Sequence, residues 1–319
     1  MEMSGIQTPY FIFKPESLKE NFEDFDDMCQ LYLEKYIVAY SVKTNSYLEV
    51  IRTLSRLGCD FEVASFKEML ITPKKAAVFN GPCKTDKELR KAVKQMSLIN
   101  VDSKSEMNKI TEIVKGKRFN IGLRISFENS KFGFDEDHLE DAIKYARLRN
   151  LDVISLHFHP GTQKTLHDFE ENLKNIERVV YKTMALGLEL AYINVGGGFP
   201  DKFQMKNLSV ELKDYFDKIE EYLEKFNTTI VLEPGRYLVA DAFELITKVE
   251  VIKENFDKTY AILDAGINLL PKITLSPYNF TKLNKNYDEG NESRNKEFIL
   301  AGPLLFNNDI LGRVYGNLK

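Results

Sequence analysis

The sequence predicts an α/β protein in which a (β/α)8 barrel of the TIM type is followed by a smaller β domain. Short apolar or β-branched runs alternate with longer amphipathic stretches from about residue 35 to 235, which is typical of repeated βα units with parallel strands. After residue 236 apolar alternation continues, as in Lys248–Ile252 and Tyr260–Leu263, but the long amphipathic stretches stop. This change indicates a separate β domain.

Eight short runs are the expected barrel strands. They are Tyr36–Tyr40, Asp60–Val63, Ala76–Phe79, Leu98–Val101, Asn120–Ile125, Leu151–His157, Leu190–Val195 and Thr229–Leu232. Helices are expected between them, among them Tyr47–Leu57, Lys104–Val114 after a capping box formed by Ser103 and Glu106, and Asp168–Leu186. Because the βα units follow one another without a visible reversal of strand order, a closed barrel is favoured over an open sheet.

The composition limits the class of partner. Of the 319 residues 43% are hydrophobic and 29% are charged, which is enough to bury a full core. The 44 Lys and Arg are interspersed with 48 Asp and Glu, so neither nucleic acid nor a membrane is expected as a partner. With no visible targeting or spanning segment, and with Cys29, Cys59 and Cys83 forming no C-x-x-C pair, a cytoplasmic location is expected.

Polar and glycine-rich clusters follow four of the expected strands. They are Ser41–Asn45, His157–Thr162, Gly196–Gly198 and Glu233–Arg236. The carboxyl ends of the strands of a parallel barrel share one face, and that face holds the active site in essentially all characterised barrels. The sequence therefore predicts one functional site built from these four clusters.

Lys43 and the glycine run each have two interpretations. A lysine after a strand is usually a solvated surface charge, but at a barrel mouth Lys43 can lose solvation and proton affinity, as an amine that forms a Schiff base must. Gly196–Gly198 can form a simple tight turn, or its bare backbone can bring N–H groups close to a phosphate.

The two histidines and Glu233 also have both a structural and a functional interpretation. His157 and His159 are two residues apart on an extended segment, so their rings are expected to point to the same side. They can be hydrogen-bonded interior histidines or metal ligands, or one ring can stack on an aromatic cofactor. No third His or Cys follows at ligand spacing, so no metal is predicted. Glu233 can pair with Arg236 at the surface, or it can bind a heterocyclic nitrogen while Arg236 binds phosphate.

Ten segments occur in the order found in one enzyme family. They are Tyr40–Asn45, Val63–Glu68, Asn80–Lys84, Val101–Glu106, Ser130–Gly133, His157–Gln163, Gly196–Pro200, Glu233–Tyr237, Asp264–Gly266 and Gly302–Asp309. With them the chain resembles the fold-type III pyridoxal-phosphate (PLP) decarboxylases, the group of diaminopimelate, ornithine and related amino-acid decarboxylases. The resemblance runs nearly from end to end.

The resemblance implies PLP as cofactor and a set of residues around it. Lys43 would carry PLP, His159 would stack on its ring and Glu233 would bind the pyridine nitrogen, which makes these three the catalytic residues. The other cofactor-binding residues would be Thr162, Gly196, Gly197, Gly198, Gly235 and Arg236. The reaction implied is decarboxylation of an amino acid, held as an external aldimine, through a carbanion at Cα.

The resemblance also places residues at the substrate. Asp264 matches a position near the substrate's distal end, and Asp309 lies in a segment that such enzymes insert into the neighbouring subunit's site, so a homodimer with shared active sites is implied. Leu305 and Phe306 stand where the family usually has a cysteine and then an acid. The substrate is thus expected to be an amino acid, free or carrier-linked, with a distal group that is not basic.

The same resemblance predicts two domains arranged as in the alanine racemase-like fold. Residues 31–240 would form the PLP-binding barrel and residues 241–319 the β domain, joined by residues 1–30 through a strand at Tyr10–Phe13. The family's later Gly-Ala-Tyr segment has no counterpart after Asp309, so the β domain is expected to be shortened or truncated.

Two other functions remain open. A non-catalytic regulator with the decarboxylase fold would be expected to have lost the Schiff-base or phosphate residues, but Lys43 and Arg236 are present. An amino-acid racemase on the same barrel needs a second acid or base and usually has arginine at the pyridine nitrogen, where this chain has Glu233. Decarboxylation is therefore favoured.

Overall fold

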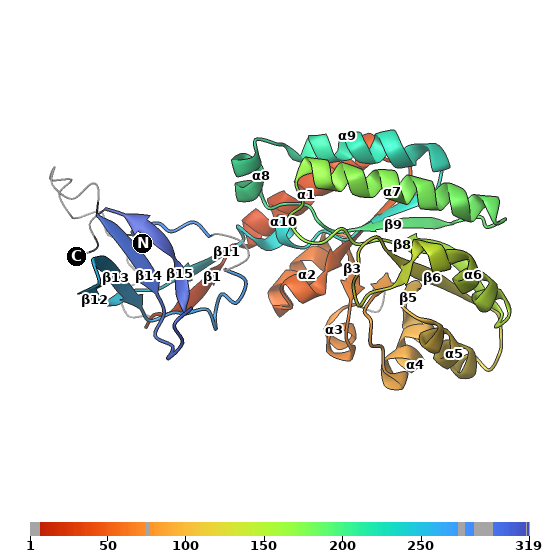
Figure 1. The fold of residues 1–319 in the computed structure, drawn as a ribbon, viewed down its shortest axis with the longest axis horizontal. Helices are drawn as coiled ribbons and strands as arrows, with labels where there is room; N and C mark the ends of the chain where they lie inside the picture. Colours follow the sequence, from red (N-terminus) through yellow and green to blue (C-terminus); the bar gives the residue numbers. More distant parts are fainter. Residues whose placement is uncertain (1–6, 74–76, 274–277, 284–295, 317, 319) are drawn as a thin grey trace. The chain divides into compact units, whose positions relative to one another are not determined.

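The computed structural model describes residues 7–73, 77–273, 278–283, 296–316 and 318. The chain divides into a barrel unit, Lys14–Ala242, and a β unit made of Met1–Phe13 and Phe243–Lys319 (Figure 1). The predicted division differs from this in the N-terminal region, because helix α1 (Pro15–Tyr32) belongs to the barrel unit.

The barrel unit contains the closed parallel barrel that the sequence predicts. Among the described residues eight strands form the ring, and the last of them, β10, pairs with the first, β2. In ring order they are β2 (Tyr36–Ser41), β3 (Asp60–Val63), β4 (Val78–Phe79), β5 (Leu98–Val101), β6 (Phe119–Ser126), β8 (Leu151–His157), β9 (Tyr192–Gly196) and β10 (Thr229–Leu232). Each predicted strand overlaps one of these, although Ala76 lies outside the described residues. A short strand, β7 (Phe134–Asp135), extends from β6.

Helices cover the outside of the barrel, and α7 (Leu166–Ala185) and α9 (Leu212–Leu223) lie side by side along it (Figure 1). The remaining helices are α2 (Leu48–Arg56), α3 (Phe66–Ile71), α4 (Asp86–Gln95), α5 (Lys104–Ile113), α6 (Leu139–Arg147), α8 (Lys202–Leu208) and α10 (Arg236–Val239). Three 3-10 turns complete them, η1 (Val42–Thr44), η2 (Glu136–His138) and η3 (Glu224–Phe226). Phe25 of α1 packs edge-on against Phe199 and Phe216, so an aromatic cluster holds α1 and α9 against the barrel.

Only one of the two hydrogen bonds of the capping box predicted for α5 forms. Ser103 accepts a hydrogen bond from the Glu106 N–H, as a capping residue does. The Glu106 side chain accepts from the N–H of Asp102 rather than from that of Ser103, and it also pairs with Lys84. A residue predicted to cap a helix thus belongs to a buried polar network.

The β unit contains two sheets in its described part. Strand β1 (Tyr10–Phe13) pairs antiparallel with β11 (Phe243–Ile246), which places the predicted N-terminal strand in this unit. The other sheet has the order β12 (Val249–Asn255), β13 (Lys258–Leu263), β14 (Glu297–Ala301) and β15 (Ile310–Tyr315). Its core consists of Ala261, Leu263, Ile273, Phe298, Leu300 and Leu311.

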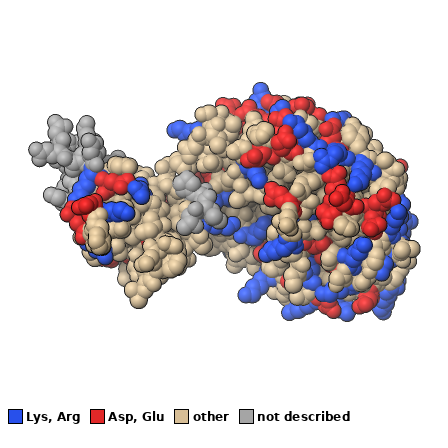
Figure 2. Space-filling view, viewed as in Figure 1, with Lys and Arg blue, Asp and Glu red and all other residues tan. Residues whose placement is uncertain are grey.

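Three global properties bear on partners. On the face of the barrel unit that Figure 2 shows, basic and acidic side chains are intermixed. In the described part of the chain, no helix combines the length and the apolar character needed to cross a bilayer. Within the same residues, no cluster of His, Cys, Asp and Glu has the arrangement of a metal site.

Candidate active site

The site is built where the strands of the barrel end. Lys43 lies in η1 directly after β2, His159 follows β8, and Glu233 follows β10. Main-chain hydrogen bonds join these strand ends: the Glu233 N–H donates to the Gly196 carbonyl over 2.8 Å, and the Ser41 N–H donates to the Pro234 carbonyl over 3.0 Å. The closed barrel therefore holds three distant parts of the sequence at one mouth.

Glu233 is a buried, ionised carboxylate. Its Oε1 accepts hydrogen bonds from the side-chain amides of Asn80 and Asn194, each over 2.8 Å, and His157 Nε2 lies 3.5 Å from its Oε2. Burial alone would raise the pKa of Glu233, but the attraction of His157 and Lys43 and the Asn194 donor outweigh it and hold this pKa well below its usual range.

Lys43 is held by a carboxylate that sequence reasoning missed. Its Nζ donates to Glu62 Oε2 over 2.5 Å and to Ser41 Oγ over 2.7 Å. Although the Lys43 side chain is partly exposed at the mouth, desolvation by the surrounding protein acts to lower its pKa, but the attraction of Glu62 and Glu233 outweighs this effect and raises the pKa. The expected loss of proton affinity is thus reversed, because two carboxylates lie near the amine. The available signal for Glu62 was its position between Phe61 and Val63 in the short strand β3, where a carboxylate is buried with its apolar neighbours.

His159 presents a neutral imidazole. Its Nδ1 accepts a hydrogen bond from the Gly197 N–H over 3.4 Å. Although His159 is an exposed residue, the surrounding protein still desolvates its imidazole, and this effect together with the positive charge of Lys43 lowers the pKa of His159 to about 3. A neutral ring of this kind can lie against an aromatic cofactor without the cost of a buried charge.

The glycine run brings β9 close to the loops beside it. Gly196 and Gly198 have φ of +70° and +100°, which side chains disfavour. A Cβ at Gly197 would lie 2.8 Å from the Glu233 carbonyl oxygen, so this position also needs glycine. The main chain of Gly196–Gly198 at the mouth is therefore not covered by side chains of its own.

The remaining predicted cofactor residues lie in the same unit. Thr162 is exposed in the loop after β8, and a Cβ at Gly235 would lie 2.3 Å from Thr44 Oγ1. Arg236, the first residue of α10, has its Nη2 3.4 Å from Asp201 Oδ2.

The four predicted substrate residues belong to the β unit. Asp264 Oδ1 accepts from Thr247 Oγ1 over 2.5 Å and from the Lys248 N–H over 3.0 Å. Asp309 is only 2% exposed, and its two oxygens accept from the N–H groups of Ile267 and Leu304 over 2.7 and 2.9 Å. Both carboxylates thus hold loops of their own unit together. Leu305 and Phe306 are exposed within that unit.

An Asp309→Ala variant should be less stable by about 1–3 kcal/mol, because two N–H groups lose their acceptor. Urea denaturation followed by circular dichroism measures the change. Asn308→Ala, at an exposed neighbouring position, is the control and should denature like the wild type. Equal midpoints for Asp309→Ala and the wild type would contradict the structural role of this carboxylate.

Together the features define a class of protein, a barrel that combines a lysine, a neutral histidine and a buried carboxylate at its mouth with a separate β unit. Residues 16–240 match the family model described as pyridoxal-dependent decarboxylase, pyridoxal binding domain. The chain belongs to this family, as the motifs indicated, and is a PLP-dependent decarboxylase.

Individual relatives agree with the family. The chain is 30% identical over 342 aligned residues to the diaminopimelate decarboxylase of Methanocaldococcus jannaschii, covering 96% of this chain and 77% of that protein. It is 29% identical to the diaminopimelate decarboxylase of Aquifex aeolicus, covering 82% of this chain and 67% of that protein. The crystal structure of diaminopimelate decarboxylase from Helicobacter pylori complexed with L-lysine superposes with a TM-score of 0.86 at 25% identity, covering 98% of this chain and 84% of that chain.

The residues present fit PLP. Lys43 supplies an amine, and Glu233 supplies an ionised carboxylate whose Oε1 is taken by two amides while Oε2 faces His157. Such a carboxylate suits a protonated ring nitrogen. The neutral imidazole of His159 and the bare backbone of Gly196–Gly198 suit an aromatic ring and a phosphate.

Proposed function

We propose that this chain removes the α-carboxylate of an amino acid with Lys43, His159 and Glu233 as its catalytic residues. The observation that carries the proposal is the buried carboxylate of Glu233, kept ionised at the mouth beside Lys43. PLP, when bound, supplies a sink for the electron pair left on Cα as carbon dioxide departs. Glu233 would hold the proton on the ring nitrogen, which makes that sink effective.

The other residues bind the cofactor and move protons. His159 would support the face of the ring, while Thr162, Gly196, Gly197, Gly198, Gly235 and Arg236 would bind the phosphate end. Glu62, which bonds to Lys43 Nζ, can take the proton that this amine must lose before it acts as a nucleophile. Lys43, with its raised pKa, can hold a proton at Nζ for delivery to Cα, a step for which Leu305 offers no thiol.

The substrate and the assembly are also proposals. The relatives are named for diaminopimelate, but Leu305 and Phe306 support a substrate whose distal group is neutral, acidic or linked to a carrier. The homodimer with shared active sites stays a prediction, supported by the exposed apolar side chains of the same two residues. The cytoplasmic location likewise stays a prediction.

Borohydride reduction tests the role of Lys43. Reduction fixes a pyridoxyl group on the amine that carries PLP, and peptide mapping of the wild type should recover that group on Lys43. The Lys43→Ala variant is the control and should yield no labelled peptide. Recovery of the label on another lysine, or on none after PLP is added, would defeat the assignment.

A further inference from the structure

The two oxygens of Glu233 have different partners. Asn80 of the loop after β4 and Asn194 of β9 both donate to Oε1, each over 2.8 Å. No amide among the described residues is bonded to Oε2, which faces His157 Nε2 at 3.5 Å. Two donors on one oxygen fix the orientation of the carboxylate and leave the other oxygen for the ring nitrogen of PLP.

Each amide can donate in one orientation only. Asn194 Oδ1 accepts from the Gly196 N–H over 2.9 Å, and Asn80 Oδ1 accepts from Asn100 Nδ2 over 2.8 Å. If Asn80 rotated by half a turn, its oxygen would face the carboxylate and its NH2 would face the NH2 of Asn100. The donor direction therefore runs from Asn100 through Asn80 to Glu233.

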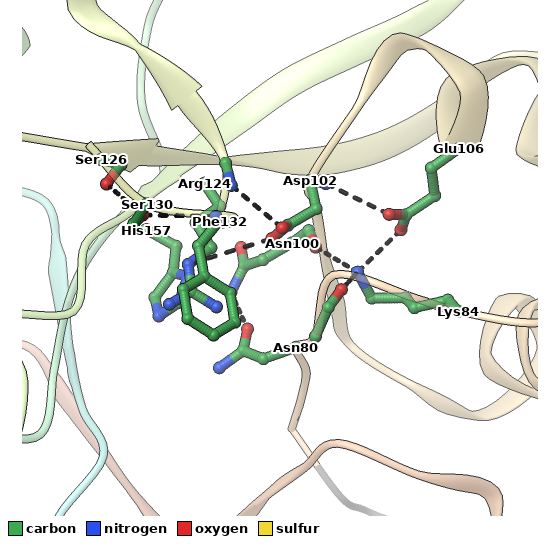
Figure 3. A network of polar contacts seen from close by, with 12 residues as sticks. Asn80, Lys84, Asn100, Asp102, Glu106, Arg124, Ser126, Ser130, Phe132 and His157 are labelled. Atoms are coloured by element: carbon green, nitrogen blue, oxygen red, sulfur yellow. Dashed lines mark hydrogen bonds and ion pairs between the residues drawn. The ribbon is translucent and has the colours of Figure 1, made fainter. Parts of the chain in front are cut away.

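Asn100 is in turn held by its surroundings on β5. It is fully buried, and its main-chain carbonyl accepts from Lys84 Nζ over 2.7 Å, beside the ion pair between Lys84 and Glu106 (Figure 3). Gly122 on β6 makes room for the amide, because a Cβ there would lie 2.0 Å from Asn100 Oδ1. These contacts confine Asn100 to the position from which it reaches Asn80.

We propose that Asn100 and Asn80 form a hydrogen-bond relay that positions Glu233 and thereby sets how strongly the site binds the ring nitrogen of PLP. This inference rests on the proposed contact between Glu233 and that nitrogen. Asn100 has no hydrogen bond to Glu233 among those of the described residues, so it is a positioning residue that acts through Asn80.

The relay predicts a binding preference that can be measured without turnover. PLP is compared with 1-deazapyridoxal phosphate, in which a C–H group replaces the ring nitrogen, by equilibrium dialysis against the cofactor-free chain. Asn80→Ala and Asn100→Ala should each reduce the preference for PLP about tenfold, the effect of weakening one hydrogen bond to a charged group. Affinity for the analogue should change little, because it has no nitrogen for Glu233 to bind.

A double variant separates a relay from general damage to the barrel. If Asn100 acts through Asn80, the Asn80→Ala/Asn100→Ala chain should show no more loss of preference than Asn80→Ala alone. Ser155→Ala is the matched control, because Ser155 is also fully buried beside Gly122 but takes no part in the relay. Should Asn100→Ala fail to fold, Asn100→Asp keeps the side-chain shape, removes the Nδ2 donor and should show the same loss.

The outcomes distinguish this inference from the proposed function. If the wild type binds PLP and its analogue equally well, both the proposed contact of Glu233 with the ring nitrogen and the relay are wrong. A wild type that prefers PLP, with the preference abolished by Glu233→Gln but kept in Asn100→Ala or Asn100→Asp, would leave the role of Glu233 standing and overturn the relay. Additive losses in the double variant would overturn it too.

Discussion

A Glu233→Gln variant is expected to keep PLP bound but to lose turnover by about a hundredfold or more, the range seen when a preorganised electrostatic group is removed. Asn80 and Asn194 both donate to the Oε1 position, so the glutamine must place its oxygen there and its NH2 where Oε2 was. An NH2 group at that point donates to an unprotonated ring nitrogen and disfavours a protonated one. The electron sink weakens accordingly.

Turnover is measured as carbon dioxide release at saturating PLP, together with the absorption spectrum of the bound cofactor. Glu221→Gln is the control, because Glu221 is an exposed glutamate on the outer helix α9 and should change neither quantity. Activity of Glu233→Gln within about threefold of the wild type, with an unchanged spectrum, would count against the proposed role.

The barrel was predictable because its signals are local. Leu151–His157 and Thr229–Leu232 occur as strands with the predicted bounds, since each is a short run of mainly apolar residues that follows a polar residue. The position of the site followed from topology: polar residues after parallel strands share one mouth, whatever the helices between them. Lys43, His159 and Glu233 could therefore be placed together from the sequence alone.

The electrostatics of the site were not predictable in the same way. The pKa of Lys43 depends on its 2.5 Å contact with Glu62 on the neighbouring strand, and a distance between two strands cannot be derived from residue order. The direction of the amide hydrogen bonds around Glu233 depends on the closure of the ring, which brings together Asn194 of β9 and the residues that directly follow β4 and β10. Neither property follows from the order of residues along one strand.

The assignment of Asp264 and Asp309 shows a further limit. A carboxylate suits an ammonium group of a substrate and a pair of main-chain N–H groups equally well, so residue type and position in a motif do not separate the two roles. The structure gives both side chains hydrogen bonds within the β unit. Family motifs can thus mark residues that shape a loop as well as residues that touch a substrate.

We expect the preferred substrate to carry a distal group that is neutral, acidic or joined to a carrier. The resemblance places Leu305 and Phe306 where relatives have a cysteine and then an acid that engages a distal ammonium. Burying an unpaired cation against leucine and phenylalanine costs several kcal/mol. Asp264 would offset only part of this cost, because its Oδ1 already accepts from Thr247 and Lys248 and a single oxygen, Oδ2, is left for a cation.

Steady-state kcat/KM for lysine, ornithine and meso-diaminopimelate, compared with glutamate and neutral amino acids, decides the question. The highest value for any of the three basic substrates would show the argument from Leu305 and Phe306 to be wrong.

Phe306→Glu restores a carboxylate at the position of the missing acid and should raise kcat/KM for basic substrates relative to glutamate by about tenfold or more, since it gives the distal ammonium a charged partner. Asn307→Glu adds the same charge at the next exposed position, so a gain confined to Phe306→Glu assigns the effect to the contact and not to net charge.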